Sequence, residues 1–247
     1  MIHRQSSIER HPFLDQTECE AIAARLPDHA ELVRQQRPQK PGTFVTYGRA
    51  AYLDACGPGS DPERDYHARV EAENRRLEGL LGDLYPHLLS RLEELLGEPA
   101  AYDPELLGLP GIHVFRGDGL TSAAEEVGHF DLQYRPLRFP APPDDAEPIS
   151  VTVPLRLPAG GGGLSIHPLT YSDYLRGRPE GQEDGLPAPP GRESSVYEEY
   201  EVGVLVLHRG LYLHGIAAPR RDYGPEEERI TLQCHGLRAG GTWWIYW

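Results

Sequence analysis

Residues 149–157 read ISVTVPLRL, a stretch in which large apolar side chains alternate strictly with other residues. Successive side chains of a β-strand point to opposite faces, so this period of two predicts a strand with one face in a hydrophobic core. The second half of the chain is therefore predicted to be rich in β-structure. The alternating positions are Ile149, Val151, Val153, Leu155 and Leu157.

Other short apolar segments, separated by Gly and Pro, lie on both sides of this strand after Gly97. Segments of this kind are typical of strands joined by turns. The further predicted strands are IHVFR (112–116), GLSIHP (163–168), VGVLVLH (202–208), LYLHGI (211–216), RITLQCHG (229–236) and TWWIYW (242–247).

The first hundred residues have a helical pattern instead. A first helix is predicted over 17–26, with Thr17 and Glu20 as its capping box. A longer helical region is predicted over 66–96, where leucines recur at steps of three and four. Pro86 lies inside this region and is expected to kink or divide it, because proline cannot donate the backbone hydrogen bond of a helix interior.

This order of elements predicts an α+β chain that forms a single domain over 1–247, mainly helical over 1–100 and β-rich over 101–247. The β-rich part is expected to be an antiparallel barrel or sandwich with the helices buttressing one sheet. Two stretches rich in Pro, Gly and charge, 139–148 and 176–195, are predicted to be long surface loops. Long loops in a compact domain are typical of lids and binding loops.

Composition excludes some classes of partner. The net charge of -14 argues against nucleic acid, because binding a phosphate backbone needs a basic patch, and it is compatible with a small neutral or cationic substrate. The three cysteines form no CxxC pair, which is typical of a reducing compartment. No secretory signal and no apolar run of membrane-spanning length is present, so a cytoplasmic protein is expected. Nothing in the sequence indicates the oligomeric state.

The triplet HFD places His129 and Asp131 two residues apart. On a strand these two side chains would share a face and could meet one ion. A third candidate ligand, His214, lies in the predicted strand LYLHGI. Two imidazoles and one carboxylate on one face of a metal leave three coordination positions open, as in non-haem iron(II) oxygenases. The competing explanation for each histidine is a surface or hydrogen-bonded core position.

Arg229 and Thr231 form a second candidate site, in the predicted strand RITLQ. They are two residues apart and would face the same way. A guanidinium pairs with a carboxylate through two parallel hydrogen bonds, and a neighbouring hydroxyl can add a third. The pattern predicts a carboxylate anchor near the metal, although Arg229 alone could also be a salt-bridged strand residue.

Five motifs occur in one order along the chain: HFD, GGGLSIHP, VGVLVLHRG, LHGI and ERITLQ. Together they resemble the double-stranded β-helix (jelly-roll, cupin-like) core of the iron(II)/2-oxoglutarate-dependent oxygenase superfamily. The opening PFLDQTECEAI resembles the helix that begins many of its members. Firm matching is confined to residues 111–236, and within the superfamily the chain is similar to the small hydroxylases and halogenases of free amino acids.

The resemblance implies that His129, Asp131 and His214 bind Fe(II), and that Arg229 with Thr231 holds the distal carboxylate of 2-oxoglutarate. O2 would take the remaining position on the metal. The implied activity is a dioxygenase that hydroxylates an unactivated C–H bond, and desaturation or ring closure would begin in the same way. Halogenating relatives have a small residue in place of the carboxylate, so Asp131 favours hydroxylation.

Candidate substrate residues are Arg49, His113, Tyr134, Trp243 and Trp244. Arg49 lies between tyrosines and is a candidate for a substrate carboxylate, with surface solvation as the alternative. The tryptophans could form a pocket wall, where an aromatic face also attracts a cation, or could pack in the core. Three more histidines lie in predicted strands and could face the site or pack: His167, His208 and His235.

The predicted substrate is a free amino acid or a similar small polar metabolite, in a biosynthetic role. One alternative is a prolyl-hydroxylase-like enzyme that acts on a peptide or protein side chain. Another is a non-catalytic, cupin-like metal-binding protein, which would have no need of Arg229. Leu132 follows the HFD triplet where an acidic residue would help to hold a basic side chain, which argues against lysine as the substrate.

Overall fold

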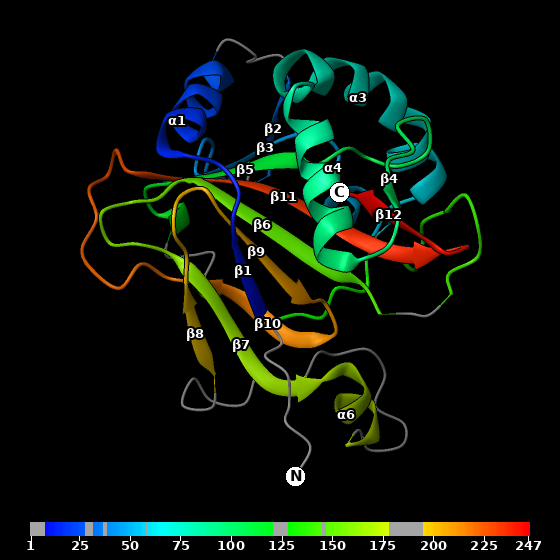
Figure 1. Cartoon of the computed structure of the whole chain (residues 1–247). Coiled ribbons are helices and arrows are strands. Elements are labelled where there is room, and N and C mark those ends of the chain that lie inside the picture. The colour runs from blue at the N-terminus through cyan, green and yellow to red at the C-terminus, as the bar shows by residue number, and fades with distance from the viewer. Residues whose placement is uncertain are drawn as a thin grey trace.

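The computed structural model of the chain describes residues 8–27, 32–36, 39–57, 59–120, 128–144, 147–177 and 195–247. Within these ranges it contains a nine-stranded sheet and a three-stranded sheet (Figure 1). The larger sheet has the strand order β1 (Ile8–Pro12), β9 (Val204–Arg209), β6 (Ile149–Arg156), β11 (Glu228–Ala239), β5 (Gly111–Arg116), β3 (Phe44–Tyr47) and β2 (Val33–Gln35). Beside this path, β12 (Thr242–Tyr246) pairs with β11 and with β4 (Ala100–Ala101).

The smaller sheet lies against the larger one on the side away from the main helices (Figure 1). It has the order β10 (Tyr212–Ala217), β7 (Gly163–Thr170) and β8 (Val196–Glu199). Leu164 and Ile166 of β7 pack with Val206 of β9, so apolar side chains join the two sheets. The predicted α+β class with a jelly-roll core is confirmed.

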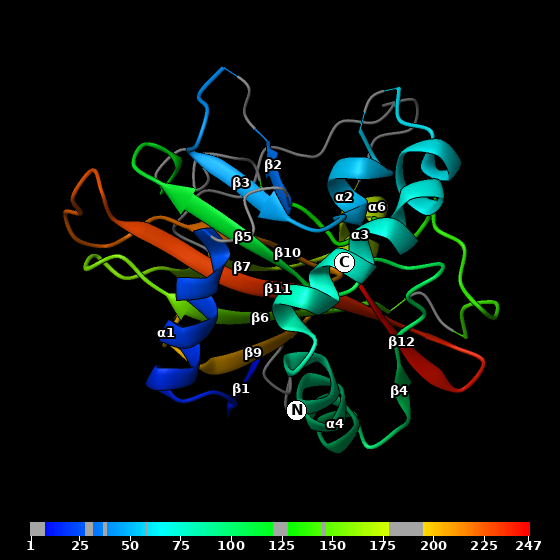
Figure 2. The same cartoon turned by 90° about the horizontal axis from the view of Figure 1, so that it is seen from above.

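Three helices cover the outer face of the larger sheet: α1 (Gln16–Arg25), α3 (Ala68–Leu81) and α4 (Leu84–Leu96). Figure 2 shows them spread over this face. Their apolar residues form the main core with the outward side chains of β5, β6, β9 and β11, which confirms that the helices buttress one sheet. The shorter helical elements are α2 (Ala51–Asp54), the π-helical turn η2 (Glu63–His67) and α6 (Tyr171–Arg176).

The predicted capping box of the first helix is wrong. Asp15, not Thr17, is the N-cap: its carboxylate accepts a hydrogen bond from the backbone N–H of Glu18, and the Glu18 side chain accepts one from the backbone N–H of Asp15. Asp15 has extended backbone angles, so the helix begins at the next residue.

The long helical region divides at Gly82 and Asp83, before Pro86. Pro86 lies in the first turn of α4, where the missing N–H costs nothing because that turn has no partner for it. The proline therefore marks the beginning of the second helix instead of a kink within one helix.

The strand over 149–157 is buried on both faces, although one buried face was predicted. Val151 and Val153 pack under the helices, whereas Ser150 and Thr152 point to the inner face, toward the smaller sheet. The inner face of β6 is therefore lined by buried polar side chains.

The first hundred residues are less helical than predicted, because β1, β2 and β3 extend the larger sheet at both ends. Of the predicted loops, residues 139–144 have no regular helix or strand, and most of 176–195 lies outside the described residues. No described helix is long and apolar enough to cross a membrane.

Candidate metal centre

The HFD triplet does not lie in a strand, which corrects the prediction. His129 forms an isolated bridge with His214 of β10: the N–H of His129 donates to the carbonyl of His214 at 2.7 Å, and the reverse bond is 3.0 Å. The N–H of Asp131 donates to the carbonyl of Gly210 at 2.8 Å. Backbone bonds thus hold the triplet against β10 and the turn that precedes it.

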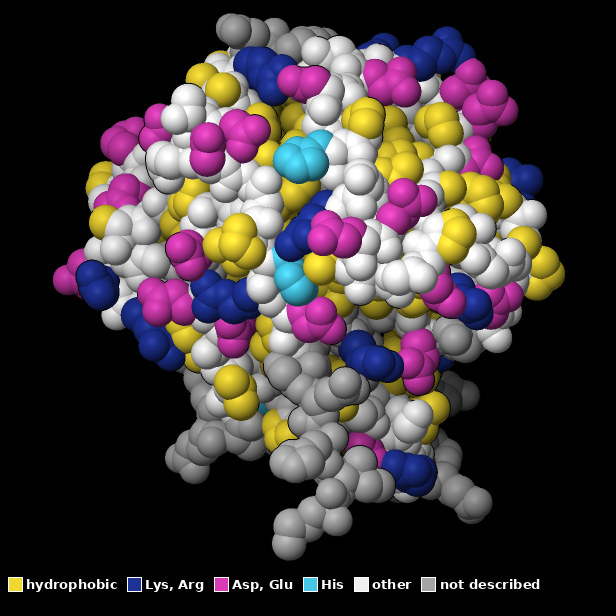
Figure 3. Space-filling model, viewed as in Figure 1, with side chains coloured by type: hydrophobic (Ala, Val, Ile, Leu, Met, Phe, Trp, Pro, Cys, Tyr) yellow, Lys and Arg dark blue, Asp and Glu magenta, His cyan; other side chains and the backbone are white. Residues whose placement is uncertain are grey.

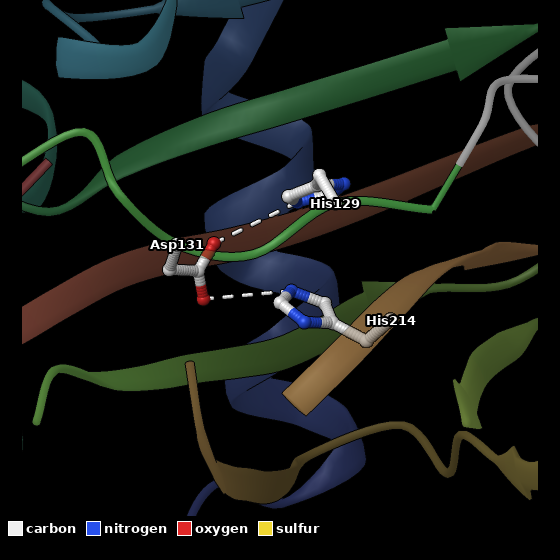
Figure 4. Close-up of side chains that lie close together, drawn as sticks. All are labelled: His129, Asp131 and His214. Atoms are coloured by element: carbon white, nitrogen blue, oxygen red, sulfur yellow. Dashed lines mark ion pairs between the residues drawn. The ribbon is translucent and has the colours of Figure 1, made fainter. Parts of the chain in front are cut away.

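The three predicted ligands meet at one place. Their ligand atoms all lie within 4.8 Å of one another. Asp131 Oδ1 is 3.6 Å from His129 Nε2, and Asp131 Oδ2 is 3.4 Å from His214 Nε2. Figure 4 shows the carboxylate facing both rings from one side, with His129 on the HFD loop and His214 on β10. The His129 side chain is 51% exposed, whereas those of Asp131 and His214 are 2% and 5% exposed.

The centre is electrostatically suited to a cation. Burial raises the pKa of Asp131, but the neighbouring histidines, His214 first, outweigh this and hold the pKa well below its usual range. Partial desolvation of the His129 ring, whose side chain is still 51% exposed, and the charge of His214 lower the pKa of His129 to about 4. Burial lowers the pKa of His214 and the anionic Asp131 raises it, with a net increase. A metal ion would compete with the proton on His214, because ligation requires a neutral imidazole.

Hydrogen bonding also prepares His214 for ligation. Its Nδ1 lies 2.7 Å from the carbonyl oxygen of Tyr212 and donates a hydrogen bond to it. Nε2 is then the ring nitrogen that can bind a metal. Two imidazole nitrogens and one carboxylate oxygen on one side of a metal fit Fe(II) with open positions.

Arg229 is a buried cation with no carboxylate beside it in the part of the chain that the structure describes. The residue is 3% exposed, and its guanidinium lies 4.7 Å from the centre of the Phe115 ring. Among the described residues it forms no ion pair, and its Nε has no hydrogen-bond partner. Burial lowers its pKa, which the nearby Tyr200 and Tyr197 hydroxyls partly oppose.

Thr231 lies on the same face of β11 as Arg229, since Ile230 between them packs into the core on the other face. Thr231 is fully buried, and its hydroxyl accepts a hydrogen bond from Gln233 Nε2 at 3.2 Å. The residue pairs across the sheet with His113 of β5. This inner face therefore has an arginine, a hydroxyl and an imidazole side by side.

Arg49 is not available for a substrate carboxylate, which corrects the prediction. Its Nη1 donates to Asp54 Oδ1 at 2.9 Å and to the carbonyl oxygen of Asp65 at 2.9 Å. Its Nη2 lies 3.7 Å from Glu73 Oε1. Arg49 is therefore paired within the fold, where it shares Asp54 with Arg34.

The other predicted substrate residues are divided between the two faces of the larger sheet. His113 lies on the inner face, where its Nε2 is 2.9 Å from the hydroxyl of Tyr52. Burial, followed by the charge of Arg229, lowers the pKa of His113 to about 3. Trp243 packs against the main core on the helix side and donates to Glu98 at 2.9 Å, so the structure does not place it near the metal centre.

Tyr134 and Trp244 belong to a second apolar cluster, and the indole N–H of Trp244 donates to the carbonyl of Ala239 at 3.1 Å. Trp247 was not among the predicted site residues. It is fully buried, and its ring lies 5.2 Å from that of His113. Tyr246, another aromatic of this segment, lies 5.7 Å from the ring of His235.

Two of the remaining histidines adjoin the metal centre. The ring of His208 lies 4.5 Å from that of His214, and burial lowers its pKa to about 3. His235 Nδ1 lies 3.8 Å from Asp131 Oδ2. His167 is buried on β7, where burial lowers its pKa and its Nδ1 has no hydrogen-bond partner among the described residues.

Neither a protein-family model nor a curated protein matches the chain. Solved structures do match. An N-substituted L-amino acid dioxygenase in complex with alpha-KG, from Burkholderia ambifaria AMMD, is 12% identical with a TM-score of 0.53 over 97% of this chain and 85% of that one. The non-heme alpha ketoglutarate dependent carbocyclase SnoK from nogalamycin biosynthesis is 16% identical with a TM-score of 0.51, over 96% of this chain and 83% of that one. The chain therefore shares the double-stranded β-helix fold of these two proteins.

Proposed function

We propose that this chain is an Fe(II)- and 2-oxoglutarate-dependent dioxygenase that acts as one domain over its whole length. The observation that carries the proposal is the meeting of His129, Asp131 and His214 within 4.8 Å, in a fold of this type. These residues hold the iron and leave one side of it open for 2-oxoglutarate and O2. When bound, iron and co-substrate supply the oxidising chemistry that removes a hydrogen atom from an unactivated C–H bond.

The surroundings of Arg229 support the second part of the proposal. A buried cation without a counter-ion is costly, so a site of this kind favours an anionic ligand. In our proposal the guanidinium pairs with the distal carboxylate of 2-oxoglutarate, and the Thr231 hydroxyl supports that carboxylate. The Tyr197 hydroxyl near Arg229 is also buried without a hydrogen-bond partner among the described residues. A non-catalytic cupin would not need this cation.

The substrate in our proposal is a free amino acid or a similar small polar metabolite, and the reaction is hydroxylation. One of the structures of similar fold acts on N-substituted L-amino acids. The retained carboxylate of Asp131 favours hydroxylation over halogenation. The net charge of -14 disfavours a nucleic-acid substrate. On the face shown in Figure 3, the described Lys and Arg side chains are scattered among acidic ones.

Iron binding tests the proposal directly. Anaerobic titration with Fe(II) is expected to saturate at one ion per chain, and His129→Ala or His214→Ala is expected to abolish tight binding. His11→Ala is a matched control, because His11 lies on the edge strand β1 and contacts Glu9. Wild-type iron content in both site variants would refute the ligand assignment.

Substrate-dependent formation of succinate tests the activity. The wild-type protein is incubated with Fe(II), 2-oxoglutarate, O2 and one member of an amino-acid panel at a time. A substrate is expected to raise succinate above the uncoupled background and to gain one oxygen atom by mass spectrometry. An oxygenated product that forms without consumption of 2-oxoglutarate would contradict the proposed reaction.

A further inference from the structure

A row of polar side chains crosses the inner face of the larger sheet beneath Asp131. Ser150 of β6 pairs directly with His208 of β9. On the other side of β6, Cys234 pairs with Val151, so the next step of the ladder places His235 beside Ser150. His235 pairs in turn with Tyr246 of β12. Residues directly opposite one another on antiparallel strands have their side chains on the same face.

The hydrogen bonds in this row have a defined direction. The Ser150 hydroxyl donates to Asp131 Oδ2, because an ionised carboxylate can only accept. Ser150 has a single proton, so it must accept at its second contact, with His235 Nδ1 at 2.9 Å. The chain of donation therefore runs from His235 through Ser150 to Asp131.

The backbone of Gly210 also lies close to the Asp131 side chain. A Cβ atom added at Gly210 would lie 2.7 Å from both Cβ and Oδ2 of Asp131, closer than real carbon contacts allow. The backbone of Gly210 and the hydroxyl of Ser150 thus limit the positions that Asp131 can take. Oδ2 accepts from Ser150 and lies 3.4 Å from His214 Nε2, whereas Oδ1 faces His129.

We propose that Ser150, oriented by His235, is a positioning residue that holds the Asp131 carboxylate in its metal-binding orientation. Neither side chain touches the metal or the substrate in this role. Hydrogen-bond partners behind a ligand raise metal affinity because they remove the ligand's freedom to turn away. The inference rests on the proposed function, since it presumes that Asp131 is a metal ligand.

The test is the affinity of each variant for Co(II), an air-stable substitute for Fe(II), followed through its visible absorption bands. Ser150→Ala and His235→Leu are each expected to weaken binding by about 10-fold to 100-fold and to shift the bands. Ser150→Thr keeps a hydroxyl, and the side-chain amide of His235→Asn can donate in place of Nδ1–H. Both conservative variants are expected to bind within about 3-fold of wild type, a small loss compared with that range.

Ser165→Ala is the matched control, a strand serine on β7 that lies between the inward-packed Leu164 and Ile166 and so points to the other face. It is expected to leave Co(II) affinity unchanged. Urea unfolding of every variant distinguishes the positioning role from a purely structural one. A purely structural role would lower stability without moving the absorption bands. If Ser150→Ala does not fold, Ser150→Cys replaces it, because a thiol has similar size and donates weakly.

The two proposals fail in different ways. If wild type binds no Co(II), or if His214→Ala binds it as well as wild type, the proposed metal centre is wrong. If wild type binds and His214→Ala does not, but Ser150→Ala or its cysteine substitute binds with wild-type affinity and bands, the metal centre stands and the positioning role of Ser150 is refuted.

Discussion

Two arginines are buried to a similar extent in this protein, but their surroundings differ. Arg49 is 7% exposed and contacts the carboxylates of Asp54 and Glu73. Arg229 is 3% exposed and has no carboxylate partner among the described residues. Since burial of a charge is costly without compensation, Arg49 serves the fold, whereas in our proposal Arg229 binds an anion. Burial alone does not distinguish the two; the counter-ion does.

The largest effect is expected in the Arg49 region. Asp54→Ala leaves Arg49 buried beside Glu73 alone and also removes the carboxylate that pairs with Arg34, so the free energy of unfolding is expected to fall by about 3 to 5 kcal/mol. The affinity for 2-oxoglutarate is expected to stay the same. Urea unfolding measures the first quantity and calorimetry the second. Glu71→Ala, which removes an exposed partner of Arg75, is the control and is expected to cost about 0 to 1 kcal/mol.

The Arg229 region is expected to show the reverse. Arg229→Met should leave the stability of the ligand-free protein unchanged or higher, because the uncompensated charge is gone. Its affinity for 2-oxoglutarate should fall by about 2 to 4 kcal/mol, the range for a forked, partly buried pair. That loss corresponds to roughly 30-fold to 1000-fold in the dissociation constant. A large loss of stability with unchanged affinity would remove the distinction between the two arginines.

Ligand-induced stabilisation sharpens the same comparison. At about 100 times its dissociation constant, 2-oxoglutarate with a redox-inert metal should stabilise wild type by about 2.7 kcal/mol. Asp54→Ala should show the same increment from a lower starting point, and Arg229→Met should show only about 0.1 to 0.9 kcal/mol at that concentration. Unfolding in urea with and without 2-oxoglutarate gives the increments. An equal increment in all three proteins would place the co-substrate elsewhere.

The smallest expected effect is a pH dependence of the free energy of unfolding, caused by His113 near Arg229. The pKa of His113 falls from 6.5 to about 3 in the folded protein. Between pH 3 and 6.5 His113 is protonated in the unfolded chain but neutral in the folded protein. The stability that this difference contributes above pH 6.5 is therefore lost as the pH falls toward 3. The slope is at most about 1.4 kcal/mol per pH unit.

His113→Asn should reduce that slope, as unfolding at pH 7, 6 and 5 would show. Arg229→Met should reduce it too, because Arg229 is one cause of the lowered pKa. If neither variant changes the slope, Arg229 does not govern the electrostatics of the inner face.

The sequence predicted the architecture because hydrophobic periodicity is a local property. The period of two over 149–157 and the leucine spacing over 66–96 correspond to β6 and to the helices α3 and α4. The three predicted ligands also come together. However, the HFD triplet reaches the other ligand without forming a strand. A single bridge between His129 and His214 joins these distant segments, and local periodicity cannot predict such a bridge.

The roles of Arg49 and Trp243 were mispredicted for a related reason. The neighbours that neutralise Arg49 include Glu73, which the fold brings close through α3. In the segment TWWIYW, alternation indicates that Trp243 and Trp244 face opposite sides, but not which side is the interior. The pairing of β12 with β11 decides this and turns Trp243 toward the helices.

The uneven exposure of the three candidate ligands has a kinetic consequence. In the proposed centre, the bond to His129, whose side chain is 51% exposed, can break at the solvent edge while Asp131 and His214 stay in place. An ion held by these residues would then leave stepwise, without any opening of the sheets. We therefore expect a chelator to strip the metal quickly from the native protein, and ferrous ion to restore it as quickly. The lifetime of the loaded state would depend on the free iron around the protein more than on the rate of unfolding.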